Sequence, residues 1–428
     1  MSTPTDAVGG SRPDGARERL AAAVRAALAA VDDPEIHRPI TELGMVAGVG
    51  VSAASAAAPA SATSAAGDRD GGPGAPVGAT WADVVVDILL TTAGCPLRET
   101  LQRDVTAAAR SVPGVARVGV RFGTMDAEQR AALTAMLRGS RGGSSGRGAV
   151  VVIPFSGADS RTRVIAVASG KGGVGKSSVT VALATTLAGQ GLTVGILDAD
   201  VYGHSIPRLL GLSGQRPVVV DRMIMPLQAH GVRVVSTGMF KPDPDDVVAW
   251  RGPMLDRALT QFLTDVHWGD LDVLLLDLPP GTGDVAISVA QRLPTARLLV
   301  VTTPQQAAAE VAERAGTLAK QTDQRVVGVV ENMSWVTCGH CGGRSEVFGS
   351  GGGARVAAAL SGRLGYPVPL LAQIPLETAM REAGDAGRPA GEVAGPEATA
   401  AFTALAAALV GARPTLVGRP LGLTPVLR

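Results

Sequence analysis

The stretch VIAVASGKGGVGKSS, residues 164–178, decides the fold of the larger part of this 428-residue chain. Its first six residues, 164–169, are mostly apolar, as expected for a buried strand. The residues that follow match G-x-x-x-x-G-K-[ST] in the strand–loop–helix order that a phosphate-binding loop requires. Backbone N–H groups of such a loop bind phosphate together with the positive end of the helix. The predicted nucleotide-binding residues are Gly170, Lys171, Gly172, Gly173, Val174, Gly175, Lys176, Ser177 and Ser178.

Aspartates follow two further apolar strands. Asp277 ends LDVLLLD, and Asp198 and Asp200 end TVGILDAD. In open α/β sheets ligands bind at the carboxyl ends of the strands, so these carboxylates are expected beside the phosphate loop. We expect Lys176 to neutralise the β- and γ-phosphates, and Ser177 and Asp277 to hold Mg²⁺. Helix capping or turn formation is the alternative for such aspartates, and for Asp284 the two interpretations are equally weighted.

Strands and helices alternate after residue 160. Continuous apolar strands separated by helices predict a parallel sheet that is covered on both faces. The fold class is therefore α/β: a doubly wound, mostly parallel P-loop NTPase domain, preceded by a small α/β domain. The strand candidates of the large domain are 164–169, 193–198, 232–237, 272–277, 297–302, 326–331 and 369–374.

The smaller domain has a shorter pattern of elements. Residues 16–31 predict an amphipathic helix that ends before Pro34, and residues 96–111 a second helix. Strands are expected at 83–91 and 115–122. A closing helix over 127–138 completes a compact α/β unit.

Low-complexity segments set the expected domain boundaries. The small domain covers 1–138 and contains an Ala/Ser/Gly/Pro insert at 52–79, which cannot bury enough apolar surface to order itself. A flexible Gly/Ser-rich linker is expected over 139–160. The ATPase domain then spans 161–411, and the proline-containing residues 412–428 form an irregular tail.

Composition excludes several classes of protein. The formal charge is +1, so no strong field favours nucleic acid or an anionic membrane as a partner. Three cysteines are too few for a disulfide framework and suggest a reducing compartment. The N-terminal sequence lacks the pattern of a secretory signal, and no apolar run is long enough to span a bilayer. The expected location is cytoplasmic.

Several motifs give a resemblance to a known family. KGGVGKS at 171–177 resembles the deviant phosphate loop of the dimeric MinD/ParA-like ATPases. Over about 160–385 the chain is similar to the Mrp/ApbC branch, which consists of ATP-binding iron–sulfur cluster carriers. His204 stands where a proline is expected in that pattern. The other matching runs are 198–211, 249–255, 261–284, 302–305, 331–334 and 348–353.

The resemblance implies roles for individual residues. Lys171 would reach across a homodimer to the partner's nucleotide, and Asp200 would position the attacking water. Asn332 would contact the adenine, although an Asn after a strand is also a common turn residue. The implied cofactors are ATP, Mg²⁺ and a [4Fe–4S] cluster, and the implied partners are a second copy of the chain and the apoproteins that receive clusters.

Cys338 and Cys341 form a C-G-H-C motif in a Gly-rich loop. Two thiolates are half of the set that a closed zinc or [4Fe–4S] site needs, and a two-fold dimer would supply all four. The resemblance favours a bridging cluster. Zinc at the same interface, a dithiol oxidoreductase and unreactive thiols remain alternatives.

Cys95 lies in TTAGCPLRE, between an expected strand and an expected helix. A helix N-terminus lowers a thiol pKa, so Cys95 could be a reactive or metal-binding thiolate, and a merely packed cysteine is equally weighted. The runs 31–46 and 91–97 resemble the small domain of iron–sulfur assembly factors that often precedes Mrp ATPases.

The leading interpretation is an ATPase whose nucleotide switches a dimer that carries and transfers a cluster. A MinD/ParA-like positioning ATPase would need a basic amphipathic helix or a basic patch, and neither is evident in the sequence. An ATP-coupled reductase that uses the same cluster is a third possibility.

Overall fold

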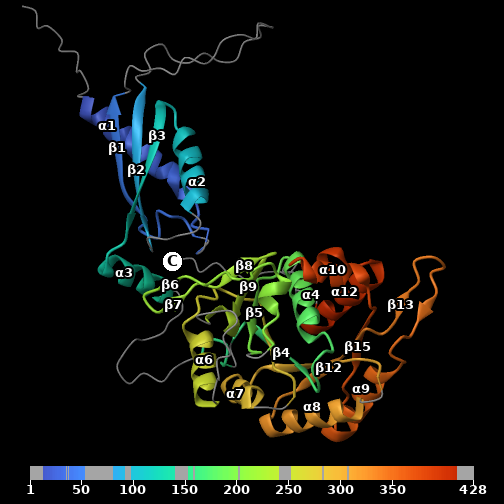
Figure 1. Ribbon diagram of the computed structural model, residues 1–428. Coiled ribbons are helices and arrows are strands. Elements are labelled where there is room, and N and C mark those ends of the chain that lie inside the picture. The colour runs from blue at the N-terminus through green and yellow to red at the C-terminus, as the bar shows by residue number, and fades with distance from the viewer. Residues whose placement is uncertain are drawn as a thin grey trace, which may run out of the picture. The chain divides into compact units, whose positions relative to one another are not determined.

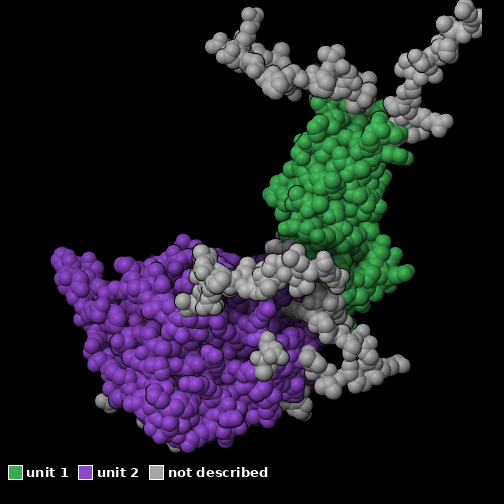
Figure 2. Space-filling view, turned by 180° about the vertical axis from the view of Figure 1, so that it is seen from behind, with its two compact units in different colours: residues 1–143, 219–223 green, residues 144–218, 224–428 purple. Residues whose placement is uncertain are grey.

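The computed structural model describes residues 13–34, 36, 38–53, 81–91, 98–139, 153–157, 160–200, 203–240, 252–281, 284–305 and 308–411. The chain forms two compact units, one of residues 1–143 with 219–223 and one of residues 144–218 with 224–428 (Figure 2). None of the described helices has the length and apolar character needed to cross a membrane.

The smaller unit contains a three-stranded sheet against which α1 and α2 pack (Figure 1). The central strand β2 pairs antiparallel with β1 and parallel with β3. Buried and half-buried residues alternate along β2, as expected for a sheet with one covered face. The elements are α1 (Pro13–Ala27), a 3₁₀ turn (Leu28–Ala30), β1 (Val46–Ala53), β2 (Ala82–Leu90), α2 (Arg98–Arg110), β3 (Val115–Thr124) and α3 (Ala127–Gly139).

Strand β1 was not predicted from the sequence, so the expected arrangement of the small domain needs correction. Residues 52 and 53, assigned to the unstructured insert, are its last two residues, and the rest of that insert, 54–79, lies outside the described residues. The sequence did not predict this strand because Gly48 and Gly50 lie among its valines and weaken the apolar pattern typical of a strand.

The larger unit contains an eight-stranded sheet in the order β15-β12-β11-β4-β10-β5-β9-β8. All neighbours are parallel except the edge strand β8, so the predicted doubly wound, mostly parallel fold is confirmed. The strands are β4 (Arg163–Ser169), β5 (Val194–Asp198), β8 (Leu227–Ala229), β9 (Val232–Ser236), β10 (Val273–Asp277), β11 (Arg297–Thr302), β12 (Val326–Asn332) and β15 (Leu370–Ile374). A short pair outside this sheet is β13 (Val336–Thr337) with β14 (Arg344–Ser345). Another is β6 (Val219–Val220) with β7 (Met223–Ile224), whose residues 219–223 are assigned to the smaller unit.

Helices cover both faces of the large sheet (Figure 1). One face packs against α4 (Lys176–Gly189), α5 (Ile206–Leu209), α11 (Ala390–Val393) and α12 (Pro396–Val410), with α10 (Thr378–Asp385) beside them. The other packs against α6 (Gly252–Thr264), α7 (Asp284–Arg292), α8 (Ala308–Thr322) and α9 (Gly352–Leu364). A 3₁₀ turn at Thr237–Phe240 follows β9.

The segment expected as a flexible linker, 139–160, is partly structured. Gly139 is the last residue of α3. Ile153 and Phe155 are buried in the core between the sheet and the helices α6 to α9. These two side chains attach the end of the segment to the larger unit, which therefore begins before residue 161. The expected tail, 412–428, lies outside the described residues.

Candidate functional site

The phosphate loop joins β4 to α4. At two of its positions a side chain larger than that of glycine would collide with neighbouring atoms. A Cβ atom on Gly170 would lie 2.6 Å from the Cα atom of Val311 in α8. Gly175 has a φ of +76°, in the left-handed region that favours glycine. A Cβ atom there would overlap the side-chain amide of Asn332. The loop is therefore fitted closely between α8 and the end of β12.

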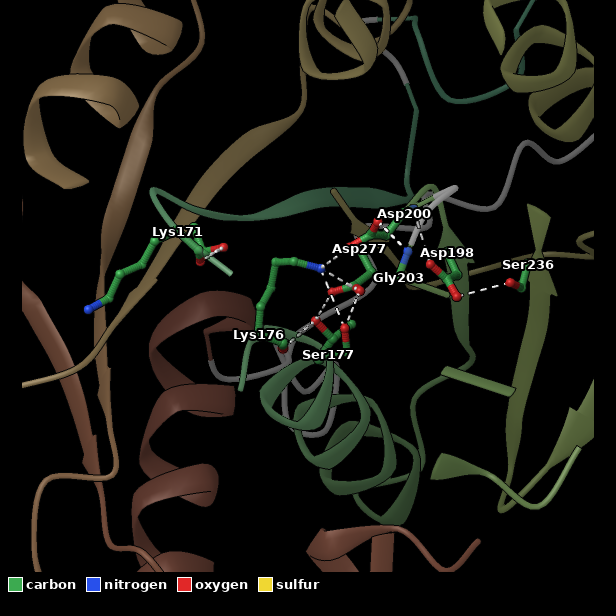
Figure 3. Close-up of polar contacts among 10 residues, drawn as sticks. Lys171, Lys176, Ser177, Asp198, Asp200, Gly203, Ser236 and Asp277 are labelled. Carbon is green, nitrogen blue, oxygen red and sulfur yellow. Dashed lines mark hydrogen bonds and ion pairs between the residues drawn. The ribbon is translucent and has the colours of Figure 1, made fainter. Parts of the chain in front are cut away.

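Lys176, the first residue of α4, lies among carboxylates at the ends of β5 and β10 (Figure 3). Its Nζ atom is 2.6 Å from Oδ2 of Asp277 and 3.8 Å from Oδ2 of Asp200. Asp277 is 0% exposed and Lys176 only 6%. Because an unpaired charge at such depth is strongly destabilising, these groups depend on one another.

Asp277 also accepts hydrogen bonds from two hydroxyls of α4. Ser177 donates to Oδ2 over 2.6 Å, and Thr180 donates to Oδ1 over 2.8 Å. The hydroxyl of Ser177 and the carboxylate of Asp277 are the hard oxygen donors that Mg²⁺ takes, and they already converge, so both residues fit the predicted metal role. Thr180 was missed in the sequence, although its position four residues after Lys176 places it on the same helix face.

Asp198 and Asp200 have different environments. Asp198 is fully buried, and Ser236 donates to its Oδ2 over 2.9 Å. Burial and the neighbouring charge of Asp277 raise the pKa of Asp198 to about 8. Asp200, also buried, instead accepts a 2.9 Å hydrogen bond from the backbone N–H of Gly203, which restrains its carboxylate.

Lys171 points away from this group of carboxylates (Figure 3). Its Nζ atom donates to Oε1 of Gln305 over 2.6 Å. The two lysines of the loop therefore face different surroundings: Lys176 is buried against Asp277, whereas Lys171 is half-buried beside Gln305.

A pocket of about 360 Å³ opens beside the phosphate loop. Gly175, Ser178 and Asn332, three of the residues predicted to bind nucleotide, line it together. The Asn332 amide donates to the Val174 carbonyl over 2.9 Å, so β12 and the loop are directly joined. Much of the remaining wall is apolar and suits a flat ring. Its lining includes Val179, Leu209, Met333, Pro375, Leu376, Met380 and Phe402.

Glu331, which the sequence analysis missed, organises the far side of Asn332. It is 1% exposed and accepts hydrogen bonds from Ser334 over 3.0 Å and Gln373 over 2.8 Å. Its second oxygen accepts from the N–H of Gly353, at the start of α9, over 2.6 Å. One buried carboxylate thus holds both ends of the segment 334–353, which contains the C-G-H-C motif.

Cys338 and Cys341 lie in the turn of the β13–β14 hairpin, and both are exposed and free. The backbone N–H of Cys338 donates to the Gly343 carbonyl over 2.8 Å, which closes the turn. Hydrogen bonds from the backbone N–H groups of Cys341 and His340, and from the Cys341 thiol, lower the pKa of Cys338. Across the described residues, no cluster of three or more His, Cys, Asp or Glu side chains could hold a metal ion.

Some candidates lie outside what the structure describes. Cys95 is among residues 92–97, and the side chain of Asp284 is likewise outside, although its backbone begins α7. The run 249–255 is described only from residue 252 onward.

Comparison with known proteins gives matches to both units. A family model for the NUBPL iron-transfer P-loop NTPase matches residues 160–410. A model for iron–sulfur cluster assembly proteins matches residues 21–58 and 78–121.

Relatives align over nearly the whole chain. A protein of Mycobacterium tuberculosis named iron–sulfur cluster carrier protein is 51% identical over 411 residues, 96% of this chain and 98% of its own length. A protein of Deinococcus radiodurans with the same name is 40% identical and covers 90% and 93% of the two chains. A nucleotide-binding protein of Archaeoglobus fulgidus, solved with ADP, is 38% identical, covers 56% of this chain and 91% of its own, and has a TM-score of 0.48.

The family model covers more than half of the chain, and the resemblance first drawn from the motifs is thereby confirmed. The chain belongs to the NUBPL-type family of iron-transfer P-loop NTPases, and its larger unit is an ATPase.

Proposed function

We propose that the protein carries iron–sulfur clusters to recipient apoproteins, as a homodimer that bridges one [4Fe–4S] cluster through Cys338 and Cys341 of both chains. ATP binding and slow hydrolysis would switch the dimer between two states. The names of the full-length relatives support cluster carriage in general.

One observation carries the proposal for the cargo site. The exposed cysteine turn follows directly from β12, whose last residue, Asn332, lines the nucleotide pocket. Two free thiols at a Gly-rich turn supply half of a four-thiolate site, and a second copy of the chain supplies the other half. An exposed site with two ligands per chain favours release of its cargo, because parting the chains would remove half of the ligands.

The residues around the phosphate loop have separable tasks in this proposal. Lys176 would move from Asp277 to the β- and γ-phosphate oxygens of ATP. Ser177 and Asp277 would hold Mg²⁺, which supplies further neutralisation of phosphate charge. Asp200 would orient the attacking water, and the base would lie in the pocket beside Asn332. Lys171, directed away from its own site, would contact the partner's nucleotide.

The test is anaerobic reconstitution of the full-length protein with iron and sulfide. Wild-type protein should become brown and bind about four iron atoms per dimer. Cys338→Ser and Cys341→Ser should each abolish bound iron, since each removes two of four thiolates from the dimer. ADP binding should be unchanged in both variants, because the phosphate loop belongs to different elements.

Cys95→Ser is the matched control and should retain its iron. Two differently tagged chains mixed during reconstitution should co-purify as iron-containing heterodimers. Iron at wild-type content in Cys338→Ser, or iron that elutes only with monomer, would contradict a bridging cluster. A colourless protein with stoichiometric zinc would instead support the zinc alternative.

A further inference from the structure

The cysteine hairpin is too short to fix its own orientation. Strands β13 and β14 share two residue pairs, Val336 with Ser345 and Thr337 with Arg344. An isolated two-stranded hairpin is at best marginally stable in water, even when longer than this. The direction in which the thiols point therefore depends on contacts with the rest of the ATPase unit.

Three of those contacts converge on one carboxylate at the start of α12. Glu397 accepts hydrogen bonds from the Trp335 indole over 3.0 Å, the Thr337 hydroxyl over 3.0 Å and the Arg344 guanidinium over 2.7 Å. The Arg344 guanidinium also stacks over the Trp335 ring, 4.2 Å from its centroid. Hydrogen bonds from Arg344, Trp335 and Thr337 lower the pKa of Glu397 to about 2, so it is ionised near neutrality.

The same elements form the wall of the nucleotide pocket. Trp335 lies two residues after Met333, which lines the pocket, and its carbonyl accepts from the N–H of Leu376 over 2.7 Å. Leu376 and Glu377 also line the pocket. The second oxygen of Glu377 accepts from the N–H of Gly395 over 2.7 Å, two residues before Glu397.

We infer that Glu397 is a positioning residue that transmits occupancy of the nucleotide pocket to the cysteine hairpin. A shift of the wall at residues 375–377 reaches the hairpin by two routes, through the Trp335 carbonyl and through Gly395 to Glu397. This inference rests on the proposed function for its purpose, but the coupling itself is a property of the chain without its cargo. Two sites are coupled only if a ligand at one changes the other measurably.

The test measures alkylation of the cluster-free, reduced, full-length protein by iodoacetamide, with and without saturating ADP. Peptide mass spectrometry separates Cys338 and Cys341 from Cys95. In the wild type, ADP should slow alkylation of Cys338 and Cys341 by about fivefold or more, because an ordered pocket wall holds the hairpin more tightly.

Glu397→Ala removes the common acceptor and should abolish this ADP effect. Glu397→Gln keeps an oxygen for Trp335 but loses the ion pair with Arg344, so it should retain part of the effect. ADP should still bind both variants, and because coupling is reciprocal its affinity should change by no more than about fivefold. Glu346→Gln is the control, since it neutralises an exposed glutamate of the same segment outside the Glu397 contacts.

The ratio of alkylation rates with and without ADP distinguishes positioning from simple support. A residue that only stabilises the hairpin would change both rates together and leave their ratio intact. An unchanged ADP effect in Glu397→Ala, or no ADP effect in the wild type, would overturn the inference. Should the wild type respond to ADP but fail to bind iron on reconstitution, the coupling would stand and the proposed function would fall.

Discussion

The carboxylates around Lys176 are almost completely buried, whereas the turn that contains Cys338 and Cys341 is exposed along its length. The first group is assembled by β4, β10 and β5, three adjacent strands of the large sheet, whose ends meet at one edge. The second is carried by a hairpin with two residue pairs.

The difference in burial matches the different requirements of a phosphate site and of the proposed cargo site. A phosphate site needs fixed geometry, which buried and mutually dependent charges provide. A site that receives and releases cargo needs access and a low cost of movement. Exposed polar contacts such as those of Glu397 are individually weak.

The largest expected effect is that of Lys176→Ala. Removing one partner of a buried charge pair costs about 3–5 kcal/mol and leaves Asp277 uncompensated. Nucleotide affinity should fall by about a hundredfold or more, as measured by calorimetric titration with ADP. Lys320→Ala, at an exposed position of α8, should bind normally. Near-normal ADP affinity in Lys176→Ala would contradict the view that the phosphate site depends on fixed, buried charges, unlike the exposed cysteine turn.

Lys171→Ala sharpens the comparison inside the loop itself. Because Lys171 faces away from the carboxylates, ADP affinity should be retained. ATP hydrolysis, followed by phosphate release, should fall by about a hundredfold or more if Lys171 stabilises the partner's transition state. Equal loss of binding in both lysine variants would argue against a role across the dimer.

Stability should respond to pH in opposite directions at the two sites. The pKa of Asp198 is raised from 3.8 to about 8. The contribution of its protonated form to the free energy of unfolding is therefore fully present below pH 3.8 and is lost as the pH rises toward 8. The pKa of Glu397 is lowered from 4.5 to about 2, so its contribution is complete above 4.5 and is lost as the pH falls toward 2.

Melting temperatures from about pH 5 to about pH 8 check the first of these effects. Asp198→Asn cannot ionise, so its melting temperature should rise relative to the wild type across this interval. Glu397→Gln should keep a constant difference from the wild type over the same interval. A constant difference for Asp198→Asn would mean that Asp198 titrates normally.

The smallest effects come from two matched threonines that donate to carboxylates. Thr180→Val removes a buried hydrogen bond to Asp277 and should lower the free energy of unfolding by about 1.5–3 kcal/mol. Thr337→Val removes an exposed hydrogen bond to Glu397 and should change it by about 0.5 kcal/mol or less. Urea unfolding of the full-length chain measures both, and equal costs would remove the distinction between the sites.

The sequence predicted what strong local patterns encode. The phosphate loop and the apolar strands that end at Asp198 and Asp277 were all located, because a parallel sheet brings strand ends together without knowledge of the loops. The family resemblance predicted that Asn332 contacts the adenine. In the structure its amide donates to the Val174 carbonyl of the phosphate loop.

Contacts between distant, ordinary residues could not be predicted. Glu397 lies 53 residues after Arg344, and neither belongs to a motif. His204, unexpected in its run, packs against Gly238, where a Cβ atom would overlap its ring, and that pairing is visible only in three dimensions. Strand β1 was missed because its glycines weaken the alternation on which strand prediction depends.

The short chain segment between Asn332 and Cys338 sets an upper limit on the distance between the nucleotide pocket and the cysteine turn. Six residue steps span at most about 20–22 Å even when fully extended. A paramagnetic centre held by Cys338 would therefore lie within a few nanometres of a bound nucleotide, whichever way the hairpin turns. Nuclear spins of the nucleotide would relax faster in its presence, and the extent of that broadening would report hairpin orientation in solution.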